Sequence, residues 1–140
     1  MIKTADEIKI AYQDIYPDLE NHYTILMSEK FQLPTYQEVV DAVKQHSVKS
    51  MKYVSNIADC EKFAWYLVWG IQKERSENPT EKLTWAIGWA TGYRIDFIGQ
   101  ESHTMVTATT SDNGIIIIDP MTDAISKPDP ETFNILLLVM

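Results

Sequence analysis

The stretch Asp59-Cys60-Glu61-Lys62-Phe63-Ala64 opens the strongest helical pattern of the 140-residue chain and contains its only cysteine. Asp59 is a residue type that often caps the start of a helix. Apolar residues then recur at the spacing of one helix face, at Phe63, Ala64, Leu67, Val68 and Ile71. The pattern predicts a helix over roughly Asp59–Arg75 with Cys60 in its first turn. The free backbone N–H groups of a first turn favour an anion, so this position favours a thiolate.

After this helix the hydrophobic period changes from that of a helix to that of a strand. The expected strands are Thr84–Ala90, Tyr93–Ile98, His103–Thr109, Gly114–Asp119 and Thr132–Val139. Asn113-Gly114 is a hairpin signal, because both residues tolerate positive φ, and it predicts that the flanking strands are antiparallel. Before Cys60, two capping boxes predict helices, one at Thr4–Glu7 and one at Thr35–Glu38. The sequence therefore predicts one α+β domain over residues 1–140, with N-terminal helices and a cysteine-bearing helix packed on an antiparallel sheet.

The charge of the chain excludes some classes of partner. Its formal net charge is −8, and the segment from Ile95 to the end holds one lysine against seven acids. Such a chain repels phosphate, so neither nucleic acid nor an anionic membrane is expected as a partner. The single cysteine needs no oxidising compartment, and the N-terminal residues lack the apolar core of a signal peptide, which together predict a cytoplasmic protein. No metal-ligand spacing and no nucleotide-binding loop is present, so no metal or cofactor is expected.

Cys60, His103 and Asp119 follow one another in the order of a thiol nucleophile, its base and the group that orients the base. His103 begins one expected strand and Asp119 ends the next, so pairing about Asn113-Gly114 would bring these two side chains within reach of each other. Plainer roles are open for the same residues. A free cysteine is most often a small buried hydrophobe, and an Asp-Pro pair commonly starts a turn.

The motifs Asp59-Cys60-x-x-Phe63-Ala64, His103 and Asp119-Pro120-x-Thr122 resemble the papain-like/transglutaminase-like cysteine hydrolase superfamily. The nearest pattern is the small papain-like domain of certain fungal agglutinins and of related phage and bacterial proteins. The resemblance covers about Tyr53 to Ile125. It implies a papain-like fold with Cys60 as nucleophile, His103 as general base and acid, and Asp119 as the residue that orients the imidazole.

The same resemblance implies a thiol-dependent hydrolase or acyltransferase that cleaves or transfers an amide or isopeptide bond of a protein or peptide substrate. The chain departs from the pattern around the histidine, where Thr104-Met105-Val106 follows, and no glutamine precedes Cys60 as an oxyanion donor. Tyr53 or Asn56 would take that role. Three alternatives stay open: a degenerate papain-like module kept for binding or host interaction, a peptidase of NlpC/P60 type, and an unrelated α+β domain.

Four tryptophans are spaced in two pairs. Trp65 and Trp69 lie four residues apart in the expected helix, and Trp85 and Trp89 lie four apart in an expected strand. The sequence favours a shared aromatic core over a ligand-stacking surface, because large rings are most often buried.

Overall fold

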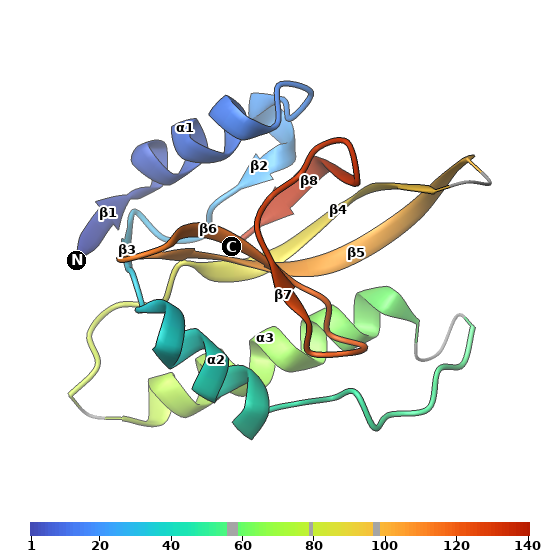
Figure 1. Ribbon diagram of the computed structural model, residues 1–140. Helices are drawn as coiled ribbons and strands as arrows, with labels where there is room; N and C mark the ends of the chain where they lie inside the picture. The colour runs from blue at the N-terminus through green and yellow to red at the C-terminus, as the bar shows by residue number, and fades with distance from the viewer. Residues whose placement is uncertain (56–58, 79, 97–98) are drawn as a thin grey trace.

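A computed structural model describes residues 1–55, 59–78, 80–96 and 99–140 (Figure 1). Its α-helices are α1 (Ala5–Ile15), α2 (Tyr36–Gln45) and α3 (Cys60–Glu77), and a 3-10 turn, η1, spans Asn21–Tyr23. Both predicted capping boxes are present, since Thr4 and Glu7 bond reciprocally at the start of α1 and Thr35 and Glu38 do so at the start of α2.

The third helix begins where the sequence predicts. Asp59 is the N-cap residue of α3 and Cys60 is its first helical residue, so the prediction that Cys60 lies in the first turn is confirmed. The carboxylate of Asp59 does not bond to the backbone of the helix. It pairs instead with the ammonium group of Lys62 at 3.4 Å.

Six strands form the main sheet, in the order β2-β8-β4-β5-β6-β7. Their bounds are Thr24–Ile25 (β2), Ile87–Asp96 (β4), Gly99–Thr110 (β5), Gly114–Ile118 (β6), Ile125–Ser126 (β7) and Phe133–Val139 (β8). Neighbouring strands are antiparallel except β2 and β8, which are parallel. A separate antiparallel pair joins β1 (Ile2–Thr4) to β3 (Lys30–Gln32). The predicted α+β class and the antiparallel hairpin about Asn113-Gly114 are confirmed.

One predicted strand boundary is wrong. The segments Thr84–Ala90 and Tyr93–Ile98 were expected as separate strands, but a single strand, β4, begins at Ile87 and runs through Gly92. Gly92 continues the strand, and its lack of a side chain lets the backbone of β8 approach closely. An added Cβ would lie 1.8 Å from the carbonyl oxygen of Asn134 on the neighbouring strand β8.

The sheet separates two hydrophobic cores. In Figure 1, α1 lies over one face of the sheet and α2 and α3 lie over the other. Ile8 and Tyr12 of α1 pack with Ile117 and Ile135 in the first core. Leu67 and Ile71 of α3 belong to the second core, together with strand residues whose side chains point to the opposite face. These strand residues include Ile87, Val106, Ala108, Ile116 and Ile118.

Candidate ligand-binding groove

The three predicted catalytic residues occupy different layers of the molecule. Val106 and Ala108 of β5 pack with Leu67 of α3, so the even-numbered residues of this part of β5 face α3. Side chains alternate along a strand, and Met105 accordingly packs on the other core. His103 shares the face of Met105. The structure therefore places His103 on the opposite side of the sheet from the helix that begins at Cys60.

His103 has its own surroundings on that side. Its ring meets the ring of Phe133 edge-on, with the centroids 6.2 Å apart. The two rings line a cavity of about 260 Å³ together with Arg94 and Met105. His103 and the helix that begins at Cys60 thus lie on opposite sides of the sheet, and the role of His103 as the base for Cys60 stays a prediction.

Asp119 lies in the turn between β6 and β7. Its Oδ1 atom accepts a hydrogen bond from the backbone N–H of Met121 at 2.9 Å, and its carbonyl oxygen accepts one from the backbone of Asp123 at 2.8 Å. The carboxylate thus stabilises its own turn, which is the plain role that the Asp-Pro sequence left open.

Of the two expected oxyanion donors, one lies within the described residues. Tyr53 is half exposed on the connector between α2 and α3. Asn56 lies outside the described residues.

The feature that best fits a ligand site is a groove beside α3, with a volume of about 570 Å³. One wall is the outward side of α3, and the other is formed by the first residues of β4, the end of β8 and the segment after β2. Its aromatic lining consists of Trp65, Tyr66, Trp69 and Trp89. The remaining lining residues are Met27, Ser28, Val68, Gln72, Thr84, Ile87, Gly88, Val139 and Met140.

Three of the aromatic side chains are open to solvent. The exposed fractions are 42% for Trp65, 54% for Tyr66 and 66% for Trp69. Trp65 is held by an edge-on contact with Trp89, with ring centroids 6.2 Å apart. The predicted shared aromatic core is therefore wrong for the tryptophans of α3. Only the strand pair, Trp85 and Trp89, packs with the second core.

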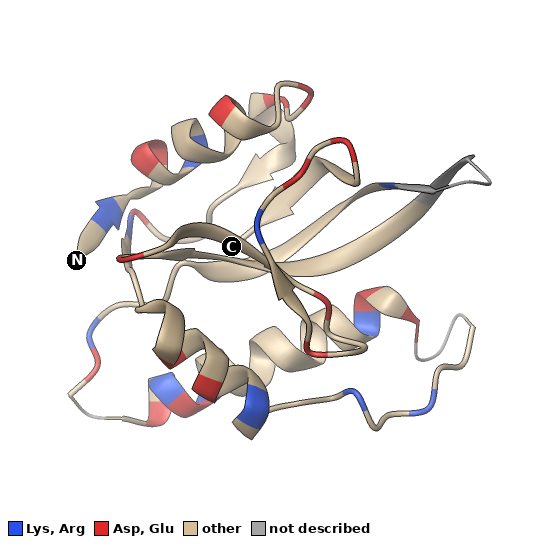
Figure 2. Cartoon of the chain, in the orientation of Figure 1, with Lys and Arg blue, Asp and Glu red and all other residues tan. Residues whose placement is uncertain are grey.

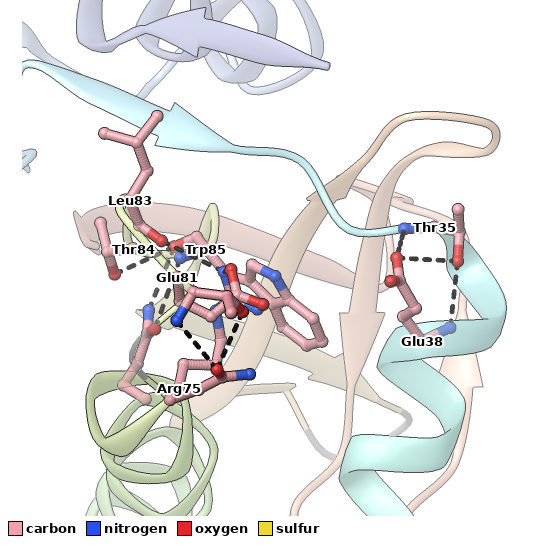
Figure 3. A network of polar contacts seen from close by, with 10 residues as sticks. Thr35, Glu38, Arg75, Glu81, Leu83, Thr84 and Trp85 are labelled. Carbon is pink, nitrogen blue, oxygen red and sulfur yellow. Dashed lines mark hydrogen bonds and ion pairs between the residues drawn. The ribbon is translucent and has the colours of Figure 1, made fainter.

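Polar contacts join the carboxyl-terminal half of α3 to the segment that leads into β4. The Nε2 atom of Gln72 donates to the carbonyl oxygen of Trp85 at 3.1 Å, and its Oε1 atom accepts from the backbone N–H of Trp85 at 3.4 Å. Arg75 donates to the carboxylate of Glu81 at 2.7 Å and to the carbonyl of Leu83 at 3.1 Å (Figure 3). These contacts fix the segment that leads into β4 against the helix.

The lining of the groove is uncharged, whereas the adjoining hollow, which shares Trp69, Gln72 and Thr84 with it, is also lined by charged residues. These are Lys73, Arg75, Glu81 and Lys82. Figure 2 shows the charged residues of α3 at its two ends, and the sequence from Phe63 to Gln72 holds none. The ammonium group of Lys62 lies 5.4 Å from the centre of the Trp65 ring and pairs with both Asp59 and Glu61. Among the described residues, none of the side chains that line the groove is charged.

Sequence reasoning missed this groove although one signal for it was present. The core face of α3 is already complete with Phe63, Ala64, Leu67, Val68 and Ile71. Trp65, Tyr66 and Trp69 are additional large rings on the remaining surface of the helix. A helix that is apolar beyond the width of one core face indicates a second contact surface.

No family model and no curated protein sequence matches the chain. Solved structures match it in fold. One is the PSL1a–E64 complex, with a TM-score of 0.77, 14% identity and 99% of this chain covered. Another is the Polyporus squamosus lectin bound to the human-type influenza-binding epitope Neu5Acα2-6Galβ1-4GlcNAc, with a TM-score of 0.78, 15% identity and 99% covered. The chain spans about half the length of these solved chains, 51% and 49% respectively.

These comparisons correct the predicted family and function. The second of these structures is named as a lectin, where the sequence motifs were expected to mark a papain-like cysteine hydrolase with a protein or peptide substrate. Among the described residues, no helix is both long and apolar enough to cross a bilayer.

Proposed function

We propose that this chain is a carbohydrate-binding domain and that the aromatic groove beside α3 holds the sugar. The observation that carries the proposal is the pair of exposed indole rings, Trp65 and Trp69, in a groove of about 570 Å³. This volume lies in the range of sites that enclose a small molecule.

The chemistry of a sugar ring fits such a surface. The flat face of a pyranose carries C–H bonds with partial positive charge, and the face of an indole ring is negative. Stacking the two removes apolar surface from water on both sides while the hydroxyl groups at the edge of the sugar stay hydrated. Ser28 and Thr84 also line the groove and supply hydroxyl groups that can bond to the ligand.

The charge of the molecule favours a neutral sugar over an anionic one. The net charge is −8, and no cationic side chain lines the groove to offset the repulsion of an acidic ligand. Of the groups near the groove, the ammonium of Lys62 already pairs with two carboxylates. The likeness in fold to the Polyporus squamosus lectin, whose solved complex contains a glycan, supports sugar binding as the class of function.

The test compares two variants on an array of neutral and sialylated glycans. Trp69→Ala removes a ring that lines the groove and is 66% exposed, while Tyr53→Ala removes a ring of similar exposure, 52%, that is outside the groove lining. We expect the wild-type chain and Tyr53→Ala to bind the same neutral glycans and Trp69→Ala to lose most of the signal. Far-UV circular dichroism of each variant checks that the fold is kept.

Two results would overturn the proposal. One is an array without any bound glycan. The other is glycan binding that Trp69→Ala leaves unchanged, since the sugar would then lie elsewhere on the molecule. Tight binding of an apolar peptide in place of any glycan would assign the groove to a protein partner.

A further inference from the structure

The groove has a direction and a length that bear on what kind of sugar it takes. Trp65, Trp69 and Gln72 succeed one another along α3, and all three line the groove. Gln72 lies seven positions after Trp65, which corresponds to about 10 Å along the helix axis. The lining is therefore longer than a single sugar ring.

Two stacking platforms lie along this direction. Residues four apart in a helix are neighbours on one side of it, and their side chains leave the helix about 6 Å apart along its axis. Trp65 and Trp69 have this spacing. The separation is close to the repeat of consecutive hexopyranose rings in a linear oligosaccharide, so adjacent rings of one chain can each meet one indole.

The two platforms differ in how firmly they are held. Trp65 is held by its edge-on contact with Trp89, has the ammonium group of Lys62 over its ring, and is 42% exposed. Trp69 is 66% exposed and stands beside Gln72, whose amide is held by the backbone of Trp85. The indole of Trp65 is therefore held in place before a ligand binds. The indole of Trp69 offers exposed apolar surface beside the fixed amide of Gln72.

On the basis of the proposed function, we infer that the groove binds an oligosaccharide through two consecutive neutral hexopyranose units, one on Trp65 and one on Trp69. A single ring can occupy only one platform and leaves the other indole in water. Affinity therefore rises sharply from one ring to two, by about tenfold if the second stack is worth as much as a favourable aromatic pair. A third ring would lie beyond Gln72, where the adjoining hollow has no indole other than that of Trp69, so a third ring has no platform of its own and adds little.

The test uses length series on one array, with glucose, galactose and N-acetylglucosamine each presented as mono-, di- and trisaccharides. Isothermal titration with the mono-, di- and trisaccharide of a series that binds then gives the affinities. We expect the disaccharide to bind about tenfold more tightly than the monosaccharide and the trisaccharide to match the disaccharide.

Two variants test the assignment of the platforms. Trp69→Ala removes the outer ring, and Trp65→Leu keeps an apolar side chain against Trp89 while it removes the flat ring. Each variant should bind mono- and disaccharides with equal affinity, because one platform is left. Tyr53→Ala should keep the length dependence.

The outcomes separate the two proposals. Equal affinity of the wild-type chain for one ring and for two would overturn the two-platform inference and leave sugar binding in place. The inference would also fail if the length dependence persisted in both variants. Absence of binding to every member of the array would remove the proposed function itself.

Discussion

At the scale of single residues, the face of β5 on which His103 lies sets it on the opposite side of the sheet from the helix that begins at Cys60. His103 and Thr104 are adjacent, and a shift of one residue moves a strand side chain to the other face of the sheet. Thr104 is the residue on the α3 side, buried and hydrogen-bonded to Thr91 at 2.9 Å. The sequence could not predict the face, because both faces of this part of β5 are buried, so the alternation of Val106, Thr107 and Ala108 does not mark a solvent side.

Glycine 92 gives a prediction at this scale. Strand β8 approaches β4 so closely that a Cβ at Gly92 would lie 1.8 Å from the carbonyl oxygen of Asn134. A backbone atom cannot move away as a flexible side chain can, so strands β4 and β8 would have to separate. We expect Gly92→Ala to lower the free energy of unfolding by about 3 kcal/mol, as severe overpacking does. Urea unfolding followed by circular dichroism measures the loss.

Gly114→Ala is the matched comparison for this prediction. Gly114 has a φ of +67° in the Asn113-Gly114 hairpin, and nothing lies within 4 Å of the position of an added Cβ. The substitution adds backbone strain without a clash and should cost about 1 kcal/mol. A loss at Gly92 no larger than the loss at Gly114 would contradict the steric argument.

At the scale of elements, the sequence predicted where helices start but did not predict what the outer side of α3 does. The starts of α1 and α2 follow from local chemistry, since each capping box links a threonine to a glutamate three residues later. The exposure of Trp69 depends on which strands and loops lie beside α3. The spacing of Trp65 and Trp69 is compatible with a core face or an outer face, and only the packed structure distinguishes the two.

The packing of α2 against α3 gives a pH-dependent prediction. The Nε2 atom of His46, at the end of α2, lies 2.5 Å from the carboxylate of Glu74 on α3, and Gln45 donates to the same carboxylate at 3.0 Å. The hydrogen bond from His46, helped by that from Gln45, lowers the pKa of Glu74 below its ordinary value of 4.5. The folded state therefore favours the ionised carboxylate.

The direction of the pH effect follows from this shift. The stabilisation by Glu74 is fully present above its unfolded pKa and is lost as the pH falls through the lowered pKa of the folded state. We expect the free energy of unfolding of Glu74→Gln to fall less between about pH 5 and pH 3 than that of the wild-type chain. Urea titrations at fixed pH steps measure this free energy. Glu77→Gln is the control, because the carboxylate of Glu77 pairs with Lys73 on the same helix. If both variants changed the pH dependence of the free energy of unfolding equally, the contact between the helices would not be its source.

At the scale of the whole molecule, the sequence predicted the α+β class and the antiparallel core of the sheet but not its layers. The helix α1 lies on the opposite face of the sheet from α2 and α3 (Figure 1). The strand β2 is only two residues long and pairs with β8 over a separation of more than 100 residues. Contacts of this range depend on the assembled core. No local pattern in the sequence marks which face a helix will cover.

The two cores share one sheet, which predicts that they unfold together. The four tryptophans lie on α3, on β4 or just before β4, and all are on the α3 side of the sheet, so their fluorescence reports the second core. Far-UV circular dichroism reports all layers. Ile135 is fully buried in the first core, on the other face of the sheet. We expect Ile135→Ala to lower the free energy of unfolding by about 3 kcal/mol and to shift the fluorescence and dichroism transitions equally.

The control is Ile10→Ala, which alters an exposed residue of α1 and should shift neither transition. If Ile135→Ala moved the dichroism transition and left the tryptophan transition in place, the two layers would be separate folding units, and the single domain predicted over residues 1–140 would be wrong.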